Sequence, residues 1–403
     1  MTTAAAPRLR EAAREPTRAL DRPLASYYLV LGSTALLVLL GLVMVLSASS
    51  VESYVQTKSS FTIFQRQAMW VAVALPLMWA ASRLPVRFYR RMAPIGLLAA
   101  LALLALVPLV GVEVKGNRNW LDLAGMRMQP SELAKLALIV WGADLLARKH
   151  RLLSQWKHLL VPLVPVSVLV LALVMLGNDL GTVLVIMAIV GALLFLVGAP
   201  LRLFAGSLLA FGTIVALLVV SSPNRMKRLG SWRTPSQDYL DAGWQAVHGH
   251  YALATGGWWG LGLGASRQKW GALPEAHTDF IFAIIGEELG LIGTLTVLLL
   301  FIALAYGGFR VAVRSNDLFV RLAAGGVTAW IMIQAVVNIG AVLGLLPIVG
   351  VSLPLVSYGG SSLITVLLGL GMLLSFARST PEAAAVLRSR PAPLRRLARQ
   401  GRR

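Results

Sequence analysis

Apolar residues in this chain gather in long, nearly continuous runs and do not alternate with polar residues. A helix needs about 20 such residues to cross the hydrocarbon core of a bilayer. The pattern predicts ten helices, near residues 27–48, 66–83, 92–112, 131–147, 159–176, 181–199, 203–221, 279–308, 322–343 and 354–377. The expected fold class is therefore all-α: a polytopic membrane protein with ten transmembrane helices.

Composition agrees with burial in lipid. The chain is 57% hydrophobic and 13% charged, whereas soluble domains carry about 25% charged residues. It has no cysteine, which excludes disulfides and thiolate metal sites.

The net charge of +20 comes from basic residues that fall mostly on one side of the predicted membrane. With the N-terminus inside, the short inner segments hold Arg83, Arg87, Arg90, Arg91, Arg148, Lys149, Arg151, Lys157, Arg202, Arg310, Arg314 and Arg321. This is the positive-inside pattern, so both termini are expected in the cytoplasm. The charge then sets topology and attracts anionic membrane lipids, and nucleic acid is not an expected partner.

The pattern divides the chain into three parts. Residues 1–26 are arginine-rich and predicted to be disordered and cytoplasmic. The first apolar run is longer than the roughly 7–15 residues of a signal peptide, so we expect an uncleaved anchor. Residues 27–377 form the membrane domain, with a long outer loop over 222–278 between the seventh and eighth helices, and 378–403 form a basic cytoplasmic tail. The loop is rich in Trp, which is typical of a segment lying at the membrane interface.

Asp279 stands where this outer loop meets the eighth helix, followed directly by Phe280, Ile281 and Phe282. Two interpretations stay open from the residues alone. Asp279, or Thr278 beside it, caps the helix. Alternatively, a carboxylate in a partly apolar setting acts as a general base, its pKa tuned by charged neighbours. These neighbours are Arg267, Lys269, Glu275 and His277.

Glu287 and Glu288 follow on the same predicted helix. At 100° per residue Glu288 points nearly opposite to Asp279, so we expect it to pair with another helix. Glu287 lies about 80° from Asp279, and it is the one of the two that can share a cavity with it.

Other outward-facing positions carry charge. Glu132 and Lys135 are i,i+3 neighbours after Pro130, and they form either a self-neutralising ion pair or a cation site for a phosphate. Lys115 and Arg118 lie in an outer loop with Trp120 and suit contact with an anionic headgroup. Asp179 marks a helix junction, with capping as the alternative to a functional role.

The segment Ser357-Tyr-Gly-Gly-Ser-Ser362 opens the last predicted helix. Free N–H groups and hydroxyls at a helix start form an anion cradle, although small residues also serve close helix packing. The cradle residues are Ser357, Gly359, Gly360, Ser361 and Ser362. No Walker A, zinc-protease or nucleophile-elbow motif is present, so ATP-driven transport and metalloprotease chemistry have no support.

Four stretches together resemble one family, in this order: Gln129-Pro-Ser-Glu, Asp179-Leu-Gly-Thr, Leu273-Pro-Glu-Ala-His-Thr-Asp-Phe-Ile-Phe and Leu353-Pro-Leu-Val-Ser-Tyr-Gly-Gly-Ser-Ser. They are similar to the SEDS glycosyltransferases (shape, elongation, division and sporulation). Within that family, Gly116-Asn-Arg-Asn-Trp and Ile285-Gly-Glu-Glu-Leu-Gly are closer to the division members than to the elongation members. The resemblance covers about residues 27–377.

The resemblance implies a peptidoglycan glycosyltransferase that polymerises lipid II on the outer face of the bacterial plasma membrane, at the division septum. It places the catalytic aspartate at Asp279, an important charged pair at Glu132 and Lys135, and a sensitive acidic position at Asp179. The implied partners are lipid II, the nascent glycan strand, a class B penicillin-binding protein, other division proteins and membrane lipids.

On this basis Asp279 is expected to accept the proton of an attacking 4-hydroxyl. Lys135, Arg118 and the 357–362 cradle are expected to bind the diphosphate, with Lys115, Lys269 and His277 also on the substrate side. A divalent cation (Mg or Mn) would suit the diphosphate, but no ligand cluster in the sequence demands one. The alternatives are a lipid II flippase and a scaffold that recruits the transpeptidase.

Overall fold

The computed structural model describes residues 22–389, apart from 115–116, 124–125, 154, 222–225, 227–229 and 233–241. Its main elements are α1 (Ala25–Thr57), α2 (Thr62–Arg83), α3 (Val86–Val110), β1 (Val112–Val114), β2 (Asn117–Leu123), β3 (Met126–Met128), α4 (Pro130–Arg148), α5 (Trp156–Leu160), α6 (Leu163–Leu176), α7 (Leu180–Leu196), α8 (Leu201–Val220), α10 (Ala242–Gly256), α11 (Ile281–Arg314), α12 (Leu318–Val342), α13 (Gly360–Ser379) and α14 (Pro381–Ser389). The chain is thus predominantly helical.

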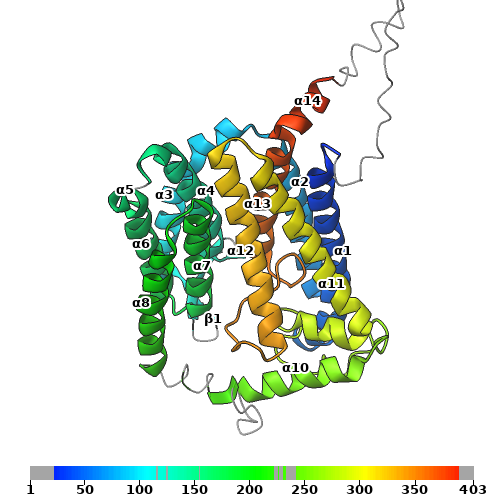
Figure 1. Ribbon diagram of the computed structural model, residues 1–403. Coiled ribbons are helices and arrows are strands. Elements are labelled where there is room, and N and C mark those ends of the chain that lie inside the picture. The colour runs from blue at the N-terminus through cyan, green and yellow to red at the C-terminus, as the bar shows by residue number, and fades with distance from the viewer. Residues whose placement is uncertain are drawn as a thin grey trace, which may run out of the picture.

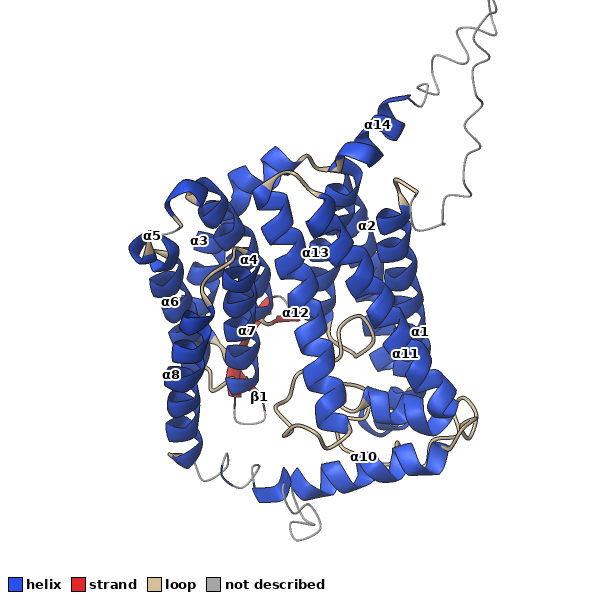
Figure 2. Ribbon diagram, in the orientation of Figure 1, coloured by secondary structure: helices blue, strands red, loops and turns tan. Residues whose placement is uncertain are grey.

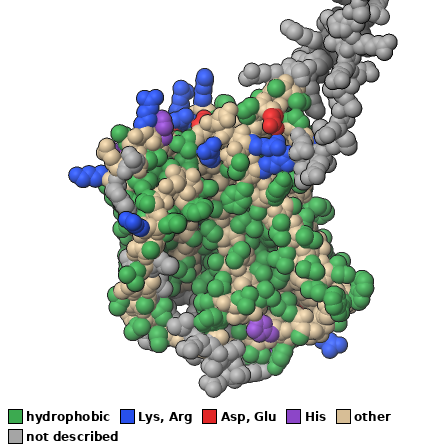
Figure 3. All heavy atoms as spheres, in the orientation of Figure 1, with side chains coloured by type: hydrophobic (Ala, Val, Ile, Leu, Met, Phe, Trp, Pro, Cys, Tyr) green, Lys and Arg blue, Asp and Glu red, His purple; other side chains and the backbone are tan. Residues whose placement is uncertain are grey.

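The long helices stand side by side in one bundle (Figure 1). Helix α14 and both ends of the described chain lie at one end of the bundle, and α10 lies across the other. Figure 3 shows Lys and Arg side chains gathered at the α14 end, above a broad hydrophobic belt. The positive-inside rule predicts that the α14 end faces the cytoplasm, and we call the α10 end the outer end of the bundle.

Six helices of the described chain are long and apolar enough to cross a membrane. They are Ala25–Thr57, Val86–Val110, Lys157–Leu176, Ile281–Arg314, Leu318–Val342 and Gly360–Ser379, with Leu180–Leu196 as a shorter apolar helix. Each of the ten predicted ranges overlaps a helix, and α6 and α7 are separate helices as expected. The last helix begins at Gly360 and not at 354, because residues 351–359 form an ordered loop that shapes the site.

Helices α12 and α13 form the centre of the bundle. In their most apolar stretches 72% and 78% of the residues are buried, against 28% in α3. Helices that are hydrophobic on all sides are buried ones, and these two present Trp330, Phe319 and Phe376 to the core. The 343–359 loop joins the outward ends of α12 and α13. Both of its ends are therefore attached to buried helices.

The strict all-α expectation is wrong in the outer loop between α3 and α4. Strands β1, β2 and β3 form an antiparallel sheet there (Figure 2), in which Val112 pairs with Trp120 and Leu121 with Met128. A short strand has a two-residue side-chain period, and a search for long apolar runs misses that signal.

Helix α11 is interrupted on its outward side. Gly290 has φ 67° and ψ −162°, outside the helical region. Only glycine adopts this backbone conformation without strain, because a Cβ would collide with the neighbouring backbone. The eighth predicted helix is therefore two segments, and the short outer one, Ile281–Leu289, follows directly after Asp279.

Candidate functional site

Asp279 precedes the outer segment of α11 and is half-buried. The helix begins at Ile281, and its cap position is Phe280, whose side chain forms no capping hydrogen bond. The cap position therefore falls on neither Asp279 nor Thr278, which were the predicted cap residues. The Thr278 hydroxyl instead donates to Glu275 Oε2 at 2.5 Å.

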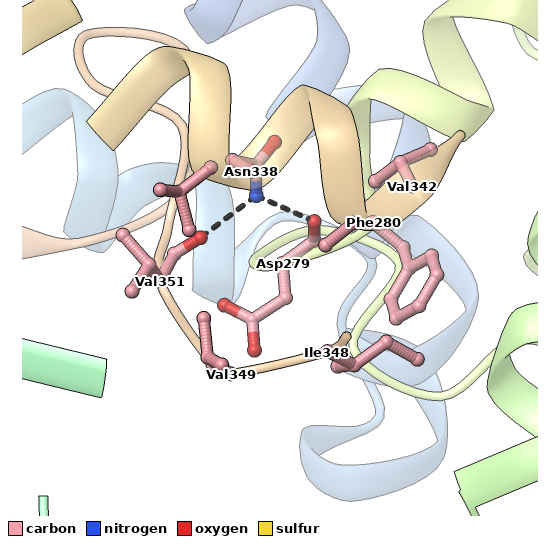
Figure 4. Close-up of a pocket in the computed structure, with 10 residues that line it drawn as sticks. Asp279, Phe280, Asn338, Val342, Ile348, Val349 and Val351 are labelled. Carbon is pink, nitrogen blue, oxygen red and sulfur yellow. Dashed lines mark hydrogen bonds between the residues drawn. The ribbon is translucent and has the colours of Figure 1, made fainter. Parts of the chain in front are cut away.

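The Asp279 carboxylate points into a pocket between α12 and the segment 348–351 (Figure 4). The pocket is lined by Asp279, Phe280, Val337, Asn338, Ala341, Val342, Ile348, Val349, Gly350 and Val351. Its lining is mostly apolar around a single carboxylate.

Asn338 fixes the two sides of this pocket. Its Nδ2 donates to the main-chain carbonyl oxygens of Asp279 and Val351, both at 2.8 Å (Figure 4). A buried amide with two acceptors resists displacement, since breaking either bond leaves a buried carbonyl unsatisfied. These bonds hold the backbone of Asp279 in place, while its carboxylate faces the pocket.

The segment carrying Asp279 is also bonded to the loop before α13. Ser357 Oγ donates to Thr278 O at 2.6 Å, and the Tyr358 N–H donates to His277 O at 2.9 Å. The His277 ring lies 5.5 Å from the Tyr358 ring. Its Nδ1 is 3.2 Å from Glu52 Oε2 without forming a hydrogen bond. The structure therefore brings His277 and Ser357 together beside Asp279.

The first turn of α13 has no capping side chain. Gly359 N donates to Gln67 Oε1 at 3.3 Å, and Ser361 Oγ accepts from Gln129 N at 3.2 Å. The first N–H groups of a helix have no partner within the helix, and here they belong to Gly360, Ser361 and Ser362. A Cβ at Gly360 would collide with the Trp70 ring, so packing against α2 alone requires glycine at 360.

Two arginines that were not predicted as site residues lie near the start of α13. Arg66 on α2 forms a side-chain hydrogen bond with Tyr358, and Arg127 on β3 lies near enough to act on the same phenol by charge. Burial raises the pKa of Tyr358, and the charges of Arg66 and Arg127 offset part of the rise. Both arginines are exposed. The two arginines lie far from the 357–362 segment in the sequence, so their proximity to Tyr358 could not be predicted.

Glu132 and Lys135 form the expected ion pair, with Lys135 Nζ 2.8 Å from Glu132 Oε1. Lys135 is 1% exposed and its ammonium lies 5.5 Å from the Trp330 ring centre. Glu132 Oε2, Ser131 Oγ and Gln334 Oε1 are buried without a hydrogen-bond partner. Both members of the pair are thus buried within the bundle.

Asp179 caps α7. Its Oδ1 accepts from Thr182 N at 3.0 Å and its Oδ2 from Thr182 Oγ1 at 2.8 Å. The same carboxylate accepts from Asn119 and Gln129 on the outer loop. The capping interpretation is confirmed, and the residue also ties the outer sheet to the start of α4.

The remaining basic residues lie elsewhere. Arg118 is exposed and donates to Pro108 O at the end of α3, at 3.3 Å. Lys115 lies outside the described residues. Lys269 is buried, and its ammonium donates to Ser47, Gly264 and Glu288.

Among the described residues no group of three or more His, Asp or Glu side chains is arranged to hold a metal ion. The chain therefore offers, within its described part, no preformed protein cage for Mg or Mn.

A helical bundle with an apolar belt and a polar site at its outward end defines a polytopic membrane protein. The model of the FtsW, RodA and SpoVE family of cell cycle proteins matches residues 27–382. A probable peptidoglycan glycosyltransferase FtsW from Mycobacterium tuberculosis is 45% identical over 372 residues, which cover 92% of this chain and 71% of that protein. Stage V sporulation protein E of Bacillus subtilis is 37% identical over 348 residues, which cover 86% of this chain and 95% of that protein.

Solved structures agree. A chain of a peptidoglycan synthase complex that coordinates polymerization and crosslinking matches with a TM-score of 0.73 at 31% identity, covering 87% of this chain and 97% of that one. The rod shape determining protein RodA of Thermus thermophilus matches with a TM-score of 0.66 at 30% identity, covering 88% and 97%. This chain belongs to the FtsW, RodA and SpoVE family, which confirms the SEDS resemblance.

Proposed function

We propose that this chain is a peptidoglycan glycosyltransferase that polymerises lipid II at the outer surface of the bacterial plasma membrane. The observation that carries the proposal is the direct bonding of the Asp279 segment to the start of α13. This bonding supports a site in which the carboxylate acts together with the start of α13 and two arginines. The family members named peptidoglycan glycosyltransferase supply the reaction class.

Asp279 acts as the general base. It accepts the proton of the 4-hydroxyl of one lipid II molecule while that oxygen attacks the anomeric carbon of the growing strand. The carbon–oxygen bond to the undecaprenyl diphosphate breaks, and the electron pair leaves with the diphosphate. One base and a good anionic leaving group support a single displacement with inversion, in contrast to the paired carboxylates of retaining enzymes.

The leaving diphosphate needs positive charge at the opposite side of the reacting carbon. We assign this to Arg66, Arg127 and the free N–H groups at the start of α13. A helix N-terminus favours a phosphate by its dipole and its unpaired donors. Arg118, Lys115 and Lys135 remain predicted substrate-side cations, with Lys135 acting from within its ion pair to Glu132.

The proposal includes the topology. Ten membrane crossings, cytoplasmic termini and a long outer loop over 222–278 agree with the charge distribution in Figure 3 and with the position of α10. A septal location and a class B penicillin-binding protein as partner follow from the division members of the family. The match to a synthase complex that joins polymerization to crosslinking supports such a partner.

Purified full-length chain, alone and with its cognate crosslinking protein, is incubated with fluorescent lipid II. We expect muramidase-sensitive glycan polymers in at least the second reaction. A folded complex that forms no polymer, but moves labelled lipid II across vesicle membranes, overturns the proposal in favour of a flippase. A complex with neither activity, in a strain that grows normally on the Asp279→Ala chain, overturns it in favour of a scaffold.

A further inference from the structure

The break in α11 at Gly290 is closed by the preceding loop. In a regular helix Leu291 N and Ile292 N would donate to the carbonyls of Glu287 and Glu288. Here all four groups bond to the 256–262 segment instead. The bonds are Leu261 N to Glu287 O (2.9 Å), Gly262 N to Glu288 O (3.0 Å), Leu291 N to Gly257 O (2.9 Å) and Ile292 N to Trp258 O (3.4 Å). The loop thus replaces one turn of hydrogen bonds in the helix.

The side chains of the two glutamates hold the next part of the same loop. Both carboxylates are 0% exposed. Glu287 accepts from Ser266 Oγ (2.5 Å), Arg267 N (2.9 Å) and Gln268 N (3.4 Å). Glu288 accepts from Ser47 Oγ (2.6 and 2.7 Å), Lys269 Nζ (3.1 Å) and Ser266 N (3.3 Å).

Lys269 completes this arrangement. An ammonium has three N–H donors, and those of Lys269 are directed to Gly264 O (2.7 Å), Ser47 Oγ (3.1 Å) and Glu288 Oε1 (3.1 Å). The side chain is 4% exposed. None of its three donors is left for a substrate, although Lys269 was expected on the substrate side.

We infer that Glu287, Glu288 and Lys269 are positioning residues that set the place of Asp279. Together with Ser47, Ser266 and the 256–269 loop they form what we call the loop clamp. The inference rests on the proposed role of Asp279 as the base. It assigns these three charged groups to the folding of the site and not to lipid II.

Asp279 is connected to the loop clamp from both sides. The outer segment Ile281–Leu289 leads from the clamp to Asp279, and Gly290 separates it from the rest of α11. The 270–278 segment leads there from Lys269 and is itself tied to α10, since Trp244 Nε1 donates to Ala272 O at 2.5 Å. A residue held by both of its flanking segments keeps a reactive geometry, in which a shift of about 1 Å lowers a rate about 100-fold.

The test uses Lys269→Met and Glu288→Gln in the full-length chain with its crosslinking partner. Hydrogen exchange, followed by mass spectrometry, reports on peptides from 256–269 and 286–294. We expect their exchange to accelerate about tenfold or more, while peptides from α12 and α13 are unchanged. We also expect kcat for lipid II polymerisation to fall about 10- to 100-fold with KM within about twofold.

A milder variant keeps the test decisive where a charge change prevents folding. Ser266→Ala removes one hydroxyl from Glu287, and Ser33→Ala on α1, whose hydroxyl bonds only within its own helix, is the matched control. Ser266→Ala should reproduce the exchange and kcat changes in weaker form, and Ser33→Ala should show neither.

A raised KM for Lys269→Met with unchanged exchange of the loop overturns the inference, because Lys269 then binds substrate. Faster exchange with unchanged kcat also overturns it, because the clamp then does not position Asp279. Failure of the wild-type chain to polymerise lipid II would instead count against the proposed function, while the exchange measurements would still report on the clamp.

Discussion

The amide of Asn338 holds the main-chain carbonyl of Asp279 at 2.8 Å. The same nitrogen holds Val351 O on the opposite wall of the pocket, also at 2.8 Å. One side chain on the central helix α12 thus connects the two loops between which the Asp279 carboxylate lies. An uncharged side chain thus helps to hold the proposed base in place, in addition to the charged residues of the loop clamp.

Replacing Asn338 with Ala should lower the polymerisation rate at saturating lipid II by about 10- to 100-fold, because Asp279 loses this support. It should also lower the free energy of unfolding by about 1–3 kcal/mol, since the two carbonyls lose a buried donor. Thermal unfolding in detergent and a polymerisation assay measure the two effects. Asn316→Ala makes the same change at an exposed inner loop, and an equal loss of activity there would contradict the assignment.

The buried pair Glu132–Lys135 allows its two roles to be separated. Lys135→Met should destabilise the protein by about 3–5 kcal/mol, because it leaves a buried carboxylate uncompensated. The double variant Glu132→Leu/Lys135→Met should recover most of that stability. If Lys135 also binds the diphosphate, the polymerisation rate stays low in the double variant. Recovery of activity along with stability would show that the pair only neutralises itself.

Arg66 and Arg127 should contribute to binding the diphosphate. Arg66→Gln and Arg127→Gln are each expected to raise the KM for lipid II about tenfold, roughly the effect of losing one charged hydrogen bond. The rise should shrink at high salt, since both side chains are exposed. Initial rates over a range of lipid II concentrations measure this. Arg321→Gln, at the inner end of α12, is the control, and an equal rise there would contradict the assignment.

Tyr358 should titrate above its ordinary range. Burial raises the pKa of this phenol, and Arg66 and Arg127 partly oppose the rise. Because the pKa of Tyr358 is higher in the folded than in the unfolded chain, its contribution to the free energy of unfolding is full below the unfolded-state pKa of about 10. This contribution is lost as the pH rises through the folded-state pKa. The absorbance difference between the wild type and Tyr358→Phe gives the midpoint, which we expect above 10. A midpoint at or below 10 would contradict burial as the main cause.

The sequence predicted the helices well, because lipid imposes a simple requirement of length and apolarity. The ranges of the ten predicted helices all overlap helices of the structure. The division near Asp179 was predicted because a single helix of roughly 40 residues is too long for one crossing. Glu288 was correctly expected to face another helix, which is α1 through Ser47. The outer sheet was missed because its alternating strands are too short to stand out beside long apolar runs.

The candidate site was predicted less completely. Glu287 was the one of the two glutamates that could share a cavity with Asp279, and it accepts hydrogen bonds from the backbone of Arg267 and Gln268. Helical angles alone do not reveal this, because the break at Gly290 and the folded-back loop depend on contacts far along the chain. Asn338 and Arg66 were missed for the same reason. Each becomes part of the site only when α12 and α2 pack against the 343–359 loop.

The most direct measurement is the rate of lipid II polymerisation by the Asp279→Asn chain, purified with its crosslinking partner and shown to be folded by its thermal unfolding. Asparagine keeps the size of the side chain but cannot accept the proton of the attacking hydroxyl. We predict a fall of about 10²- to 10⁴-fold, the usual contribution of a general base, while Asp317→Asn, which keeps a capping side chain at the start of α12, remains active. Polymer formation by Asp279→Asn at the wild-type rate would contradict the account.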